Sequence, residues 1–214
     1  MVLHYGADSL VTAPIYGAGN PTNDYGLGFY LTPDKKMARL WASKFPQGGY
    51  AISFKVALEG LKVLYLNSNT QEDILRWITI LVSHRFDADD YEQHRQAIDW
   101  LKRHYYPDIS GYDVIVGYRA DDSYFGYSKS FVANDLSIEK LSEAMKLGKL
   151  GLQYVLVSKK AFSKARYASH EAVPHSSEYE AFREGVLEQY RIIKSQDKDT
   201  NTFLRDIRRQ YPDD

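Results

Sequence analysis

Two glycines stand directly before a short aromatic segment in the stretch DYGLGFY, residues 24–30. Glycine permits positive φ and close backbone approach, so the simplest interpretation of Gly26 and Gly28 is a hairpin or a bulge. A second interpretation is a binding site, because a planar aromatic ligand needs backbone without side chains on one side and a ring to stack against, which Tyr30 offers. A phosphate-binding loop is not expected here, since neither a third glycine at dinucleotide-fold spacing nor a Gly-Lys-Ser/Thr sequence follows.

A pair of acidic residues is the second candidate for chemistry. Asp121 and Asp122 end an expected strand and adjoin Arg119. Adjacent residues in an extended strand face opposite sides, so we expect one of the two carboxylates to point into a cleft. The alternative is a solvated turn, or an aspartate that caps the following segment. Residues 170–175 hold two histidines and a glutamate, but a proline interrupts them, and no metal site is expected.

Composition narrows the function classes. The 214-residue chain has 27 basic and 28 acidic side chains, so no overall positive field attracts nucleic acid or an anionic membrane. The absence of cysteine excludes thiol nucleophiles, zinc ribbons and iron–sulfur centres, and it fits a reducing, cytoplasmic location. No segment approaches the roughly 20 apolar residues of a membrane span. The 18 tyrosines favour surfaces that are both apolar and hydrogen-bonding.

Local patterns predict where the elements that position these residues begin and end. Thr32, Pro33 and Asp34 are typical of a helix start, with Thr32 as the N-cap. Residues 50–58 alternate with period two, which predicts a strand with one buried face. Further strands are expected over 2–6, 28–32, 61–66, 112–122 and 152–158, and helices over 32–45, 69–86, 87–106, 137–148 (closed by Gly148), 177–196 and 200–211.

The order of these elements predicts the fold class. Strands and helices mingle without the strict alternation of a parallel doubly wound sheet, and the strands are short. We therefore expect an α+β fold with mostly antiparallel strands. Residues 1–175 should form one domain, a split strand core with inserted helices, and residues 176–214 should form a helical C-terminal extension.

Four sequence blocks, taken in order, resemble the ADP-ribosyltransferase superfamily. The similarity is to its NAD-binding half, in the branch of poly-ADP-ribose polymerases and diphtheria toxin. It is closer to a bacterial family of unknown function that is placed in this superfamily and is often encoded beside a small antitoxin-like gene. The resemblance implies an ADP-ribosyltransferase-like fold over residues 1–165. The blocks are Leu3-His4-Tyr5-Gly6, DYGLGFYLT (24–32), Tyr112-Asp113 through Gly117 to Ala120-Asp121-Asp122, and Gln153-Tyr154 with apolar residues 155–157.

The resemblance implies that these blocks bind NAD as a co-substrate. Gly6 would present backbone groups to the nicotinamide carboxamide. Tyr30 would stack on the nicotinamide ring, while Gly26 and Gly28 would give the dinucleotide room to approach the backbone. Thr32 closes the same block.

One position departs from the pattern of the superfamily. Tyr5 stands where a histidine would hold the adenosine ribose, and His4 is one place earlier. A one-residue shift in a strand turns a side chain to the opposite face. Either Tyr5 supplies the contact, or a local bulge brings His4 round to the pocket. The alternative for His4 is a half-buried strand residue.

A second departure affects catalysis. Gln153 stands where the polymerases and diphtheria-like toxins carry a glutamate, which accepts a hydrogen bond from the nicotinamide ribose and favours the oxocarbenium-like sugar cation. Glutamine keeps the hydrogen bond and loses the charge, a loss that commonly costs on the order of 10²- to 10³-fold in rate. Either turnover is slow, or Asp121 or Asp122 supplies the charge.

These implications predict an enzyme that transfers ADP-ribose from NAD to a macromolecular acceptor, either protein or nucleic acid. It would act as the toxin of a bacterial toxin–antitoxin pair, with a small antitoxin protein as partner. If water captures the sugar cation, the side activity is NAD hydrolysis. Two alternatives remain open: a silent module that binds NAD or ADP-ribose, and an interaction domain whose C-terminal helices dock another chain. No membrane partner is expected.

Overall fold

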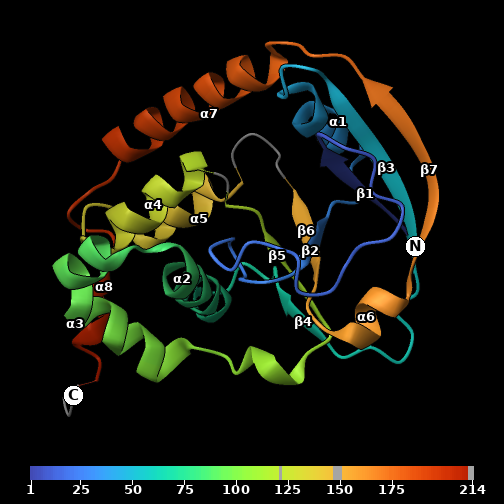
Figure 1. Ribbon diagram of the computed structural model, residues 1–214. Helices are drawn as coiled ribbons and strands as arrows, with labels where there is room; N and C mark the ends of the chain where they lie inside the picture. Colours follow the sequence, from blue (N-terminus) through green and yellow to red (C-terminus); the bar gives the residue numbers. More distant parts are fainter. Residues whose placement is uncertain (121, 147–150, 212–214) are drawn as a thin grey trace.

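Two β-sheets pack against each other, and a group of helices covers the outer face of one of them (Figure 1). The computed structural model describes residues 1–120, 122–146 and 151–211, with the backbone alone for residues 122–124. The strands are β1 (Val2–Ala7), β2 (Phe29–Leu31), β3 (Gly49–Val56), β4 (Val63–Leu66), β5 (Val114–Tyr118), β6 (Leu152–Leu156) and β7 (Ala165–Val173). The helices are α1 (Lys35–Ser43), α2 (Gln71–Arg85), α3 (Ala88–Tyr105), α4 (Asp122–Val132), α5 (Ile138–Ala144), α6 (Lys159–Ser163), α7 (Glu178–Ser195) and α8 (Leu204–Arg208), with a short 3₁₀ turn at Ile109–Gly111.

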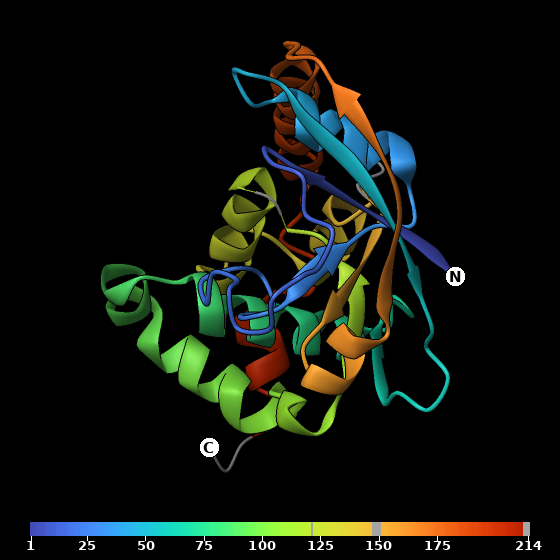
Figure 2. The same cartoon turned by 45° about the vertical axis from the view of Figure 1, so that its right-hand side comes forward.

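The strand order confirms an α+β fold with mostly antiparallel pairing. The first sheet has the order β1-β3-β7 and is antiparallel, whereas the second has the order β2-β6-β5-β4 and pairs β4 with β5 in parallel. The sheets meet where His4 of β1 and Thr32 exchange backbone hydrogen bonds of 2.7 and 2.9 Å. Figure 2 shows β3 and β7 running side by side as the longest strands, with α3 at the far end of the molecule.

Apolar side chains from alternate strand positions make two cores. Between the sheets, Phe29 of β2 meets Phe54 of β3 edge to face, with ring centroids 5.2 Å apart, and Leu3 is fully buried beside them. On the other face of the second sheet, α2 and α3 bury Trp77 and Trp100. None of the described helices combines the length and the apolar character that a membrane span requires.

The expectation of one buried face for residues 50–58 is wrong. β3 is the central strand of its sheet, and Ile52 and Phe54 face the second sheet. On the opposite face, Ala51 packs with Ala38 and Ala42 of α1, so both faces are covered. The sequence shows alternation because α1 approaches closely and admits only small side chains there.

The helix start predicted at Thr32 is also wrong. Asp34 is the N-cap of α1, and its side chain accepts a hydrogen bond from Lys36 N at 2.8 Å. Thr32 is engaged in the bridge to His4, and its hydroxyl accepts from Asp34 N at 3.1 Å. Thr32 therefore ends the strand segment, and the helix begins after Asp34.

Three elements were not predicted, namely α4, α6 and β7. β7 is an edge strand, and most of its side chains are exposed and polar, so no hydrophobic alternation marks it. The helical C-terminal segment is confirmed as α7 and α8, and α7 contacts α1, α4 and α5. The end predicted at Gly148 lies outside the described residues, and the domain division at residue 175 stays a prediction.

A glycine substitution tests the packing of the segment before β2. Gly26 has φ +73°, and an added Cβ would lie 2.7 Å from Cε1 of His84. Gly17 has φ +83° with nothing within 4 Å, so it is a matched control. Gly17→Ala should cost about 1 kcal/mol of unfolding free energy for the backbone, and Gly26→Ala about 1–3 kcal/mol more for the overpacking. Equal losses in urea denaturation would contradict the contact with His84.

Candidate functional site

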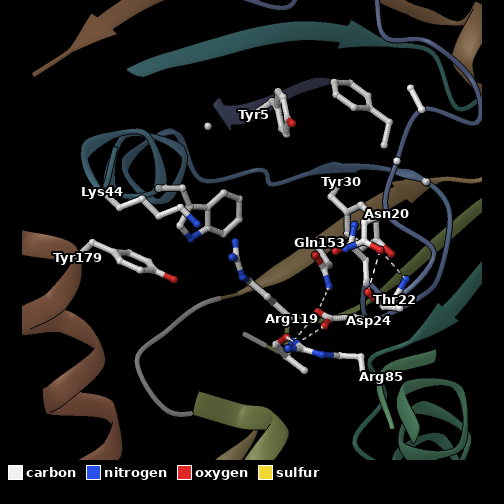
Figure 3. A pocket seen from close by; sticks show the side chains of 18 of the residues that line it. Tyr5, Asn20, Thr22, Asp24, Tyr30, Lys44, Arg85, Arg119, Gln153 and Tyr179 are labelled. Atoms are coloured by element: carbon white, nitrogen blue, oxygen red, sulfur yellow. Dashed lines mark hydrogen bonds and ion pairs between the residues drawn. The ribbon is translucent and has the colours of Figure 1, made fainter. Parts of the chain in front are cut away.

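A cavity of about 660 Å³ opens where the two sheets meet (Figure 3). Its walls come from β1, the segment before β2, α1, the end of α2, the segment after β5, β6 and the start of α7. Distant parts of the chain thus converge on one volume. The side chains used below are Tyr5, Asp24, Tyr30, Trp41, Lys44, Arg85, Arg119, Gln153 and Tyr179.

Asp24 is a buried carboxylate in the wall of this cavity, with 7% of its surface exposed. Its Oδ1 accepts from Nη1 of Arg85 at 2.8 Å, and its Oδ2 accepts from Ala120 N at 2.9 Å and from Nε2 of Gln153 at 3.0 Å. Burial raises the pKa of the Asp24 carboxyl, while the charges of Arg85 and Arg119 oppose that rise. The carboxylate joins the segment before β2 to α2, to β6 and to the segment after β5.

Gln153 projects from β6 and is 3% exposed. Three donors meet the two oxygens of Asp24, and this arrangement fits the ionised carboxylate despite its burial, because a carboxyl proton would have no acceptor among them. The NH₂ half of the Gln153 amide therefore faces Asp24. The carbonyl oxygen Oε1 is therefore the half of the amide that stays available to accept a hydrogen bond. Gln153 is an oriented acceptor in the cavity wall.

Tyr30 holds the segment before β2 in place. Its hydroxyl donates to the carbonyl oxygen of Gly26 at 2.6 Å and accepts from Tyr25 N at 3.0 Å. Its ring lines the cavity, and burial raises the pKa of its hydroxyl. Tyr30 thus combines a structural hydrogen bond with a ring surface in the cavity.

The two glycines of this segment serve packing. The missing side chain of Gly26 faces His84, and Gly26 is absent from the residues that line the cavity. Gly28 lines the cavity, yet an added Cβ would lie 2.5 Å from Cγ1 of Val155 on β6. Their positions favour the simpler interpretation of the pair, in which glycine allows a tight backbone approach.

Tyr5 faces the cavity, whereas His4 faces the other side of β1. The pairing of β1 with β3 is regular from Val2 to Ala7, so no bulge turns His4 round. The ring of Tyr5 packs against Phe29 with centroids 4.9 Å apart. His4 Nδ1 lies 3.0 Å from Oγ of Ser53, as expected for a half-buried strand residue.

Aromatic and cationic side chains form the end of the cavity near α1 and α7. The guanidinium carbon of Arg119 lies 3.6 Å from the ring centroid of Trp41, and Nζ of Lys44 lies 5.3 Å from that of Tyr179. The indole Nε1 of Trp41 is buried and has no hydrogen-bond partner within the part of the chain that the structure describes. With Arg85, which is paired with Asp24, three cationic side chains line the cavity.

A second, mainly apolar cavity of about 420 Å³ adjoins the first. The two share five lining residues, so they lie on either side of a common wall made of Tyr5, Ala18, Gly19, Gly28 and Phe29. The further lining includes Leu10, Val11, Ile15 and Phe162. Together they could hold a ligand with a charged part and an apolar ring.

Three further residues predicted for the site are not among the described residues that line the cavity. Thr32 is buried outside the cavity, with 1% of its surface exposed. Asp121 lies outside the described residues, and Asp122 begins α4 with a side chain that is not described. The role proposed for these carboxylates stays untested.

Sequence reasoning missed six of the nine side chains used above, namely Asp24, Trp41, Lys44, Arg85, Arg119 and Tyr179. Asp24 opens the DYGLGFY stretch, but attention there fell on the glycines and the tyrosine. Arg119 was noted only as a neighbour of the acidic pair. A search for charged residues at the start of each predicted site block could have found Asp24.

The fold and cavity define an α+β protein with a polar site at the junction of two sheets. The chain belongs to the family described as "Protein of unknown function (DUF3990)", whose model matches residues 1–167. The match contains every residue of the cavity discussed above except Tyr179 on α7. No curated protein and no solved structure matches the chain.

The two hydrogen bonds of the Tyr30 hydroxyl make a testable contribution to stability. Tyr30→Phe keeps the ring but leaves the Gly26 carbonyl and the Tyr25 N–H without this partner, so we expect a loss of about 1–3 kcal/mol in unfolding free energy. Tyr65→Phe is the control, because Tyr65 is 54% exposed and should change stability by less than about 0.5 kcal/mol. Urea denaturation measures both, and similar losses would refute the anchoring role.

Proposed function

We propose that the protein is an NAD-dependent ADP-ribosyltransferase and that its core is an ADP-ribosyltransferase-like fold. The observation that carries the proposal is that residues from distant parts of the sequence meet in one cavity. Tyr5, Gly6, Gly28, Tyr30 and Gln153 line one cavity, although they are spread over most of the chain. All five positions lie in the blocks that resemble the NAD-binding half of that superfamily, although Tyr5 and Gln153 replace the histidine and the glutamate of its pattern.

The chemistry of the two cavities supports a dinucleotide ligand. NAD carries a flat base, a pyrophosphate and a second flat ring, in that order. The apolar cavity beside Tyr5 and Phe29 suits adenine, and the cationic side chains of the larger cavity suit the pyrophosphate. Gly6, Tyr30 and Trp41 then bound the space for nicotinamide.

The proposed reaction is a dissociative substitution at C1′ of the nicotinamide ribose. The bond between C1′ and the nicotinamide nitrogen breaks, its electron pair leaves with nicotinamide, and an oxocarbenium-like cation forms on the sugar. An acceptor nucleophile then bonds to C1′ and gives up its proton. Oε1 of Gln153 accepts a hydrogen bond from a ribose hydroxyl and keeps the sugar in position.

The acceptor in this proposal is a macromolecule, either protein or nucleic acid, in the cytoplasm. The role as the toxin of a toxin–antitoxin pair, with a small antitoxin protein as partner, rests on the family resemblance alone. Water in place of the acceptor would give NAD hydrolysis. Nicotinamide is released in both reactions, so it is the product to measure first.

Calorimetric titration of NAD, with chromatography for nicotinamide in the same samples, tests the proposal. We expect binding and slow release by the native protein. Tyr5→Ala should weaken NAD binding roughly tenfold or more, because the aromatic wall shared by the two cavities is lost. His4→Ala is the matched control on the opposite face of β1 and should leave the affinity unchanged.

The possible outcomes separate the alternatives. Binding without release in the native protein would favour a silent NAD-binding module. No binding would refute the proposal. Equal losses in Tyr5→Ala and His4→Ala would show that the strand is disturbed and that Tyr5 does not contact the ligand.

A further inference from the structure

We infer that Asp24 is the positioning residue of this site. Through its hydrogen bond to Gln153, the Asp24 carboxylate supplies the negative charge that the Gln153 amide lacks. The inference rests on the proposed function for its catalytic consequence. Its structural part, a single unit made of the Asp24 carboxylate and the Gln153 amide, stands on the geometry alone.

The contacts of Asp24 show that the carboxylate does more than pair with Arg85. Arg85 bonds to Oδ1 at 2.8 Å, which leaves Oδ2 to Gln153 and to the backbone N–H of Ala120. The oxygen that meets the amide is therefore not the one that meets the guanidinium. The hydrogen bond to Gln153 is buried and joins the segment before β2 to β6.

This arrangement fixes the direction of the amide. If the amide turned over, Oε1 of Gln153 would face Oδ2 of Asp24, two acceptors at hydrogen-bond distance with no proton between them. The charge of Asp24 also polarises the amide, since linked hydrogen bonds strengthen one another in a low-dielectric interior. Oε1 thus faces the ribose as a stronger acceptor than an isolated glutamine would provide.

The position of the charge explains how glutamine can stand at residue 153. Two buried carboxylates 3.0 Å apart would repel, and one of them would take up a proton. With a carboxylate at residue 24, an amide at residue 153 is the compatible partner. The pair therefore needs one carboxylate and one amide. We expect the double variant, which exchanges the two groups between residues 24 and 153, to be tolerated better than either single substitution.

A charge-exchange cycle tests this unit, with the variants Asp24→Asn, Gln153→Glu and the double variant. Asp24→Asn meets three donors with a single acceptor oxygen, and Gln153→Glu places two carboxylates together. The double variant restores one carboxylate and one amide, although Ala120 N–H loses its acceptor. The thermal midpoint of the double variant should lie about 2–4 °C above the value obtained by adding the two single-variant shifts to the native midpoint.

Nicotinamide release measures the catalytic consequence. Asp24→Asn should lower the release rate roughly 100-fold with little change in NAD affinity, and the double variant should recover to within about tenfold of the native rate. Asp197→Asn is the matched control. Asp197 also accepts hydrogen bonds, from Ser137 N and Asn201 Nδ2, but it lies outside the cavity and outside the four sequence blocks, so its loss should lower stability without slowing release.

The midpoint shifts and the release rates test different parts of the inference. Additive midpoint shifts would overturn the Asp24–Gln153 unit whether or not the protein is an enzyme. Unchanged release in Asp24→Asn, or a double variant no faster than Asp24→Asn, would overturn the charge role. If the native protein binds NAD and releases no nicotinamide, the proposed transferase fails and the charge role falls with it, while coupled midpoint shifts would still support the positioning of Gln153.

Discussion

A buried carboxylate constrains its surroundings because every lone pair must find a donor. Asp24 meets this requirement with a guanidinium from α2, a backbone N–H from the segment after β5 and an amide from β6. Removing one partner of such a group is costly, commonly about 3–5 kcal/mol for a buried ion pair. Asp24 therefore links the segment before β2 to α2, to β6 and to the segment after β5. The same side chain lies in the wall of the polar cavity.

A second constraint acts between β1 and α1. A Cβ on Gly6 would lie 2.2 Å from the carbonyl oxygen of Ala38, so the helix rests directly on the strand. This close approach brings the last turn of α1, with Trp41, and Lys44 just beyond it to the cavity. Gly6 lines the cavity as well, and its lack of a side chain serves both the packing and the site.

Sequence reasoning correctly predicted the helices and strands whose patterns lie within their own residues. The periodicity of α2 and α3, the short strands β2 and β6, and the helices of the C-terminal segment follow from their own residues. Sequence reasoning failed for features that depend on neighbouring parts of the fold. β3 is covered on its second face by α1, the edge strand β7 has no buried alternation, and Thr32 gives its backbone to β1 instead of capping a helix.

The same limit applies to the site. Tyr5, Gly6, Tyr30 and Gln153 could be selected because each lies in a recognisable block. Asp24 opens one of these blocks, but no local pattern shows its role, since its partners lie 61, 96 and 129 residues away in the sequence. An aspartate before a glycine-rich turn is usually a solvated residue, and only the tertiary fold turns this one into a buried hydrogen-bond acceptor.

The wall of the cavity formed by Tyr179 has a consequence for biosynthesis. Tyr179 is synthesised after Tyr5, Tyr30, Trp41 and Gln153, so these four side chains leave the ribosome before it does. A nascent chain lacks this wall until Tyr179 has also left the exit tunnel. Ligand binding that needs the complete cavity is therefore delayed until the start of α7 has emerged.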